Sequence, residues 1–144
     1  MHREFFAVHI YQDEFHSMRE AHFIFYGGLM SNNILVDLSM EFAVNTVNLC
    51  DTVKGKAALT NQLLRSGTSI GANNHEANYA QSKADFTSKL QIALKECYES
   101  EYWLELFFKT NLISSETYAQ FKNDCGKLRR ILIASINTAK ENNH

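Results

Sequence analysis

The sequence of 144 residues contains no proline and only six glycines. Average usage would give about seven prolines in a chain of this length, and proline is the strongest breaker of helices. The scarcity of both breakers predicts long, uninterrupted helices. The longest apolar run near the N-terminus, residues 23–26, is too short for a secretion signal or a membrane span. We therefore expect a cytoplasmic protein without membrane contact.

The sequence also has few cysteines and little net charge. Cys50, Cys97 and Cys125 are odd in number, far apart and set in apolar helical pattern. This usage predicts reduced, buried thiols rather than a disulfide framework or a zinc site. A net charge of -2 gives no overall attraction to phosphate backbones. Binding of nucleic acid would therefore need a local basic patch or an assembled surface.

What the sequence does contain is a helical hydrophobic period from residue 31 onward. Gly55 ends a first helix, Ser82-Lys83-Ala84-Asp85 resembles a capping box, and Ser114 or Ser115 caps the last helix. The expected helices cover about residues 32–54, 57–80, 83–110 and 115–141. Joined by short turns, they predict an all-α, antiparallel up-down-up-down four-helix bundle over residues 30–144. The first and third helices carry surplus apolar residues, which predicts a homo-oligomer.

Residues 1–29 differ from this domain. They hold four of the six histidines and five of the ten phenylalanines, without a clean helical stripe. Gly27 and Gly28 precede Met30, and two glycine codons shortly before a methionine codon are typical of a translated ribosome-binding site. We hypothesise that Met30 is the native start and that residues 1–29 are an upstream extension. Peptides from this segment in the natively expressed protein would contradict the hypothesis.

Small and polar residues interrupt the apolar pattern in the middle of the second helix. Gly67 and Gly71 stand four residues apart, where small side chains allow another backbone to approach closely. A phosphate-binding loop is disfavoured because the P-loop lysine and a preceding strand are both missing. Ser66 and Ser69 have no base at a suitable spacing. The stretch therefore predicts a helix seam, with no catalytic residue, no cofactor, no metal ligand and no small-molecule substrate.

A polar ladder follows one face of the same helix, in steps of four, four and three residues. Its members are Arg65, Ser69, Asn73 and Glu76. We expect a structural network in which the two charged members pair with the third helix or a neighbouring subunit, through residues such as Glu96, Glu99 or Lys95. The alternative is that the ladder lines a groove or pore that holds a ligand.

A modest basic patch lies on the last helix, partly offset by Asp124. It consists of Lys122, Lys127, Arg129 and Arg130. In a single subunit this pattern is typical of a solvated face, whereas repeated around a ring it would contact phosphates. No aromatic residue interleaves with it, so base stacking is not predicted.

Several of these stretches together resemble a known family. They are Gln62 to Asn73, Glu76-Ala77, Ser82 to Phe86, Ile92 to Glu96 and Tyr102 to Leu104. They are similar to the bacterial four-helix-bundle proteins encoded in intervening sequences of 23S ribosomal RNA genes, over about residues 30–140. The resemblance implies a small bundle that assembles as a ring, with a pentamer expected, and a start near Met30.

The same resemblance extends to the accessory bundle proteins of diversity-generating retroelements, which bind nucleic acid and reverse transcriptase. Those relatives are strongly basic and this chain is not. We expect a non-enzymatic, homo-oligomeric scaffold that binds RNA or a ribonucleoprotein through the assembled ring. The alternative is a protein interaction module without nucleic-acid contact.

Overall fold

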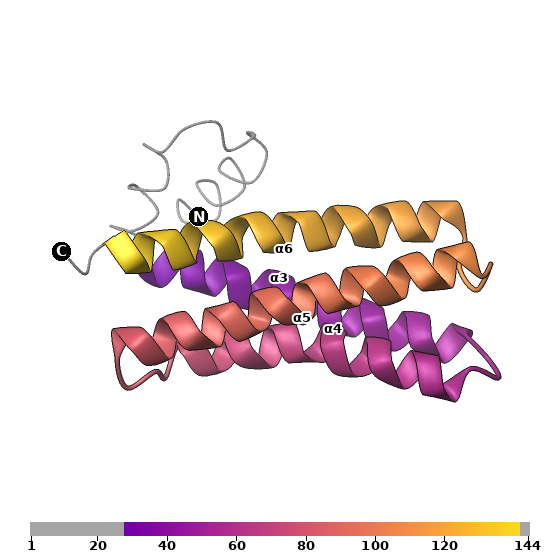
Figure 1. Ribbon diagram of the computed structural model, residues 1–144, viewed down its shortest axis with the longest axis horizontal. Helices are drawn as coiled ribbons and strands as arrows, with labels where there is room; N and C mark the ends of the chain where they lie inside the picture. The colour runs from indigo at the N-terminus through magenta and orange to yellow at the C-terminus, as the bar shows by residue number, and fades with distance from the viewer. Residues whose placement is uncertain (1–27, 142–144) are drawn as a thin grey trace, which may run out of the picture.

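The computed structural model describes residues 28–141, with side chains from residue 34 onward. It contains four helices, namely α3 (Gly28–Thr52), α4 (Ala57–Ala77), α5 (Lys83–Lys109) and α6 (Ser115–Glu141). The connecting turns alternate between the two ends of the molecule, so each helix runs opposite to the one before it (Figure 1). The predicted all-α four-helix bundle is confirmed. None of these four helices combines the length and apolar character needed to cross a membrane.

The proposed N-terminal extension, up to residue 27, lies outside the described residues. The start at Met30 therefore stays a prediction. The first described helix is already helical at Gly28, the first described residue, so it extends beyond the expected start near residue 32.

Local signals account for the other helix ends. Gly55 separates α3 from α4 with a φ of 73°, a backbone conformation that glycine adopts without strain. The Ser82 hydroxyl accepts a hydrogen bond from the Asp85 amide at 3.1 Å and caps α5. At the start of α6 the Ser114 hydroxyl accepts from the Thr117 amide at 3.1 Å, so Ser114 rather than Ser115 is the cap. These contacts satisfy amides that helix ends leave unpaired.

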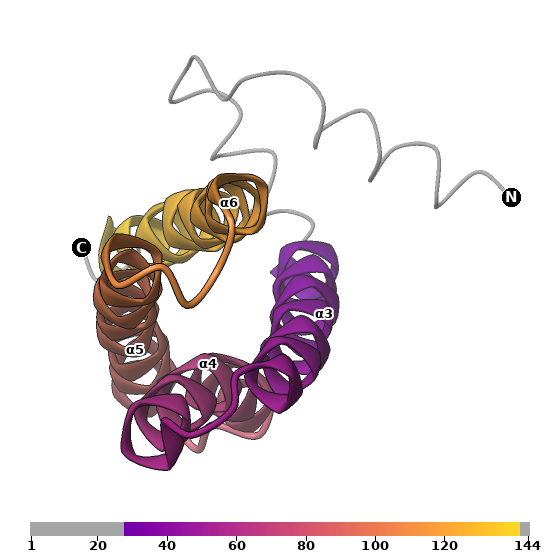
Figure 2. The same cartoon turned by 90° about the vertical axis from the view of Figure 1, so that its right-hand side faces the viewer.

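Seen from one end, the helices follow the order α3, α4, α5, α6 around the bundle (Figure 2). The α4–α5 interface is the most extensive of the four, and the α3–α6 interface is the smallest. Phe42 of α3 and Phe121 of α6 meet edge to face across it, with ring centroids 5.6 Å apart. Fully buried side chains from all four helices fill the centre, including Leu35, Leu63, Ile70, Leu90, Leu104, Leu128 and Leu132.

Candidate functional site

The two glycines of α4 face α3. A Cβ atom added to Gly67 would lie 2.9 Å from Cγ2 of Thr46, and one added to Gly71 would lie 3.3 Å from the backbone oxygen of Ser39. Real Cβ atoms essentially never approach as closely as the first of these distances. The missing side chains therefore let α3 and α4 pack closely, at two points one helical turn apart.

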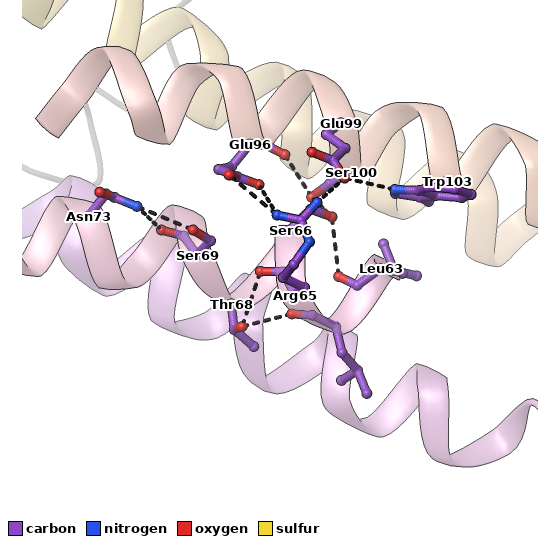
Figure 3. Close-up of polar contacts among 11 residues, drawn as sticks. Leu63, Arg65, Ser66, Thr68, Ser69, Asn73, Glu96, Glu99, Ser100 and Trp103 are labelled. Atoms are coloured by element: carbon purple, nitrogen blue, oxygen red, sulfur yellow. Dashed lines mark hydrogen bonds and ion pairs between the residues drawn. The ribbon is translucent and has the colours of Figure 1, made fainter. Parts of the chain in front are cut away.

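Arg65 lies on the other side of α4, against α5 (Figure 3). One guanidinium nitrogen is 3.2 Å from a carboxylate oxygen of Glu96, and the other contacts the carboxylate of Glu99. The indole Nε1 of Trp103 donates to Glu99 at 3.2 Å. The Arg65 hydrogen bond, followed by that from Trp103, lowers the pKa of the Glu99 carboxyl. This end of the polar ladder is an ion-pair network between two helices of one subunit.

The remaining ladder members also have structural partners. Glu76 pairs with Lys89 of α5 at 2.5 Å, not with Lys95. Because α4 and α5 are antiparallel, the last turns of α4 lie beside the first turns of α5, where Lys89 stands. The Nδ2 atom of Asn73 donates to the backbone oxygen of Ser69 at 2.9 Å and is 3.2 Å from its hydroxyl.

Two buried polar features escaped the sequence prediction. The hydroxyls of Ser66 and Ser100 lie 2.9 Å apart in the α4–α5 interface, both fully buried (Figure 3). Ser100 donates its single proton either to Ser66 or to the Glu96 carbonyl, and Ser66 donates to the Leu63 carbonyl. Among the described residues, neither hydroxyl has a base as a hydrogen-bond partner. The side chain of Asn74 is fully buried, and among the residues whose side chains the structure describes neither its Nδ2 nor its Oδ1 has a hydrogen-bond partner. The sequence did hold a signal for the burial of Ser100, because this serine occupies a core position in the apolar stripe of its helix.

The four basic residues of α6 do not gather into one free cationic surface. Arg129 contacts the Glu101 carboxylate of α5, with its guanidinium 5.5 Å from the Tyr98 ring. Lys127 lies 3.6 Å from the carboxylate of Asp124. Lys122, 5.7 Å from the Tyr118 ring, and Arg130 are the two exposed members. At about 100° per residue, the four side chains spread over an arc of roughly 160° around α6.

A polar groove of about 220 Å³ runs between α3 and α6, the pair with the smallest interface. Its lining residues are Leu38, Glu41, Phe42, Asn45, Gln120, Asp124, Lys127 and Leu128. Two carboxylates face one ammonium group there, so the groove does not favour a phosphate. The ladder residues of α4 are not among its lining residues.

An apolar stripe follows the outer face of α3. Met40, Val44 and Val47 are 57%, 51% and 41% exposed. Their spacing of four and three residues makes them neighbours on one helix face. Leu35 and Phe42 of the same helix are buried, so α3 has one apolar face in the core and another in contact with solvent.

The comparisons place the chain in a family. Comparison with the curated proteins finds no match. Among solved structures, the chain is similar to a protein with unknown function from the S23 ribosomal protein family of Bacteroides thetaiotaomicron, a crystal structure at 1.70 Å resolution. The two share 48% identity with a TM-score of 0.71, over 75% of this chain and 99% of that one. Residues 31–134 match the family described as 23S rRNA-intervening sequence protein, and the chain belongs to that family.

Proposed function

We propose that this protein is a non-enzymatic helical scaffold that works as a homo-oligomer, with a pentamer as the expected stoichiometry. The observation that carries the proposal is the α3 stripe, Met40, Val44 and Val47, in which apolar side chains about half exposed stand side by side. Single exposed apolar residues are common on monomers, whereas contiguous patches mark interaction sites. A second copy of the chain offers an apolar partner for this face.

Self-association is tested by light scattering coupled to size exclusion at micromolar concentration. The expected mass is a multiple of the 16.5 kDa chain, five-fold for a pentamer. Val44→Glu places a charge in the stripe and is expected to give monomers with unchanged helicity. Asn137→Glu, which adds the same charge at an exposed polar position of α6, is the matched control and should assemble normally. A wild-type chain that runs as a clean monomer would rule out the proposal.

RNA or a ribonucleoprotein is the partner we propose for the assembled ring. Each subunit contributes the exposed cations Lys122 and Arg130, and a ring would repeat them. Binding to structured RNA, measured at two salt concentrations, should weaken steeply with salt because phosphate contacts release counterions. A protein that binds no RNA at low salt would remove this part of the proposal while leaving the assembly intact.

The pairing of the other two cations favours a second candidate function. Arg129 contacts Glu101 and Lys127 lies beside Asp124, so these side chains are engaged within the subunit. A scaffold that recruits another protein without nucleic-acid contact is consistent with that arrangement. The salt dependence of binding separates the two candidates, because only phosphate contacts give the steep counterion-release slope.

A further inference from the structure

Two buried cysteines and one carboxylate meet between α5 and α6. The Sγ atoms of Cys97 and Cys125 and a carboxylate oxygen of Glu101 all lie within 4.8 Å of one another. Cys97 and Glu101 stand four residues apart, so they share a face of α5, and Cys125 approaches from α6. Both cysteines are fully buried, while the Glu101 side chain is 25% exposed. Protein therefore surrounds the two sulfur atoms, and solvent reaches the cluster past the Glu101 side chain.

This donor set suits a thiophilic metal ion. Two thiolates and a carboxylate oxygen are ligands that Zn²⁺ accepts, whereas Mg²⁺ and Ca²⁺ prefer oxygen alone. With Zn–S distances of about 2.3 Å, ligand atoms around a tetrahedral ion lie roughly 3.5–3.8 Å apart. From separations of up to 4.8 Å, the three atoms would need to move toward one another by at most about 1.3 Å to reach that spacing, a shift within the range of side-chain torsions.

The charges around the cluster balance with and without an ion. Arg129 contacts the Glu101 carboxylate, so the pair is neutral while both thiols carry their protons. One divalent ion held by two thiolates and Glu101 has a net charge of -1, which Arg129 again cancels. Uncompensated charge next to a buried site is costly, and neither state has any.

We propose that Cys97, Glu101 and Cys125 form a binding site for a thiophilic divalent metal ion of the Zn²⁺ class. Binding replaces two thiol protons, which leave to solvent, with two metal–sulfur bonds, and no electron is transferred. Arg129 acts as an outer partner that orients Glu101. The bound ion links α5 to α6 and stabilises the bundle, because it binds the folded chain in preference to the unfolded one.

The test uses Cd²⁺ alone as the probe, with the full-length, tag-free chain and a phosphine reductant that keeps the thiols reduced. Thiolate-to-cadmium charge-transfer absorption in the ultraviolet should appear and saturate at one ion per chain, with a rise in Tm. Prior loading with Zn²⁺ should raise the Cd²⁺ concentration needed for half of the absorption, because the two ions compete for the same thiolates. This signal requires sulfur ligands, so binding by the histidines of residues 1–29 does not produce it.

Cysteine variants identify the ligands. Cys97→Ala and Cys125→Ala should each lose the absorption, and Glu101→Gln should weaken the affinity by about 10-fold or more. Cys50→Ala is the matched control, because Cys50 is also buried but lies outside the cluster. Its thiol donates to the Thr60 carbonyl at 3.7 Å, as the Cys97 thiol does to the Cys125 carbonyl at 3.4 Å in the absence of metal. Loss of Cys50 should leave the cadmium absorption unchanged.

Two results would overturn the site. They are a wild-type chain that gives no absorption with excess Cd²⁺, and an absorption that depends on Cys50. Circular dichroism checks that each alanine variant folds. If one does not, the wild-type titration, Glu101→Gln and Cys50→Ala still decide the question. The site is independent of self-association, so a monomeric protein that binds the metal would refute only the proposed scaffold.

Discussion

At the scale of single residues, Asn74 is the polar side chain whose presence costs stability. It is fully buried on α4, and both polar atoms of its amide lack a hydrogen-bond partner within the described part of the chain. A buried, unsatisfied amide of this kind destabilises a protein by about 1–3 kcal/mol. Buried polar residues in helical bundles are best known for fixing register or assembly state, so Asn74 is a candidate for that role here.

Asn74→Leu should raise the free energy of unfolding by about 1–2 kcal/mol, because leucine keeps the branched shape and removes the unsatisfied atoms. Chemical denaturation measures the change. Asn73→Leu is the control: its neighbouring amide donates to the Ser69 carbonyl and is half-buried, so no gain is expected. A loss of stability in Asn74→Leu would mean that the amide has a partner in solution.

Glycine substitutions test the close approach of α3 and α4. Gly67→Ala places a Cβ 2.9 Å from Cγ2 and 3.0 Å from Oγ1 of Thr46. The overpacking should lower the free energy of unfolding by about 1–3 kcal/mol, which outweighs the gain of about 1 kcal/mol from the higher helix propensity of alanine. Gly126→Ala is the matched case in α6, since its nearest neighbour would be the mobile end of Arg130 at 3.5 Å. The free energy of unfolding of Gly126→Ala should rise by up to about 1 kcal/mol.

A second substitution tests whether contact with Thr46 causes the loss of stability in Gly67→Ala. Thr46→Ala removes both of the closest atoms and should rescue much of the Gly67→Ala loss in a double-mutant cycle. If the losses of stability in Gly67→Ala and Thr46→Ala simply add in the double variant, the close approach of α3 and α4 is not the cause of the Gly67→Ala loss. Thermal or urea unfolding is a sufficient readout for all four chains.

At the scale of helices, the Arg65–Glu99 contact makes the α4–α5 interface sensitive to acid. The pKa of Glu99 is lower in the folded protein than its ordinary value of about 4.3, chiefly through the Arg65 hydrogen bond. The pair therefore stabilises the fold above that ordinary value, and its contribution is lost as the pH falls through the folded pKa. Arg65 is half exposed, so the contribution is about 1 kcal/mol or less.

The expected measurement is urea unfolding of the wild type and Glu99→Gln between about pH 6 and pH 3. The wild type should be the more stable chain at the upper end, and the difference should shrink as the pH falls. In an Arg65→Met background most of that difference should already be absent at about pH 6. A difference in stability between the wild type and Glu99→Gln that grows toward low pH would contradict a stabilising role of this ion pair.

Helices were predictable from the sequence, whereas the partners of individual side chains were only partly so. The apolar period, Gly55 and Ser82 are local signals, and they fixed the elements to within a few residues. The ion pair of Glu76 with Lys89, however, depends on the stagger between α4 and α5, which no local pattern encodes. The same holds for the approach of Cys97 to Cys125, which stand on different helices.

At the scale of the whole molecule, the α3 stripe and the two exposed cations of the basic patch lie on different helices. The exposed apolar stripe belongs to α3, whereas the basic residues belong to α6, and the groove between these helices has acidic lining residues. Assembly through α3 would leave Lys122 and Arg130 available only if the subunit interface does not cover α6. Substitution of these two cations leaves the α3 stripe unchanged, so it tests RNA binding without disturbing self-association.

Lys122→Glu combined with Arg130→Glu should reduce the affinity for structured RNA by at least about 10-fold at low salt, and lower the salt slope by about 1 for each phosphate contact removed. Both side chains are exposed, so the oligomer mass and helicity should stay unchanged. Arg129→Glu is a less specific variant, because it sets a second carboxylate against Glu101 and loosens the α5–α6 contact. RNA affinity and salt slope that remain at the wild-type level in the double variant would place any RNA contact on another surface and favour the protein interaction module.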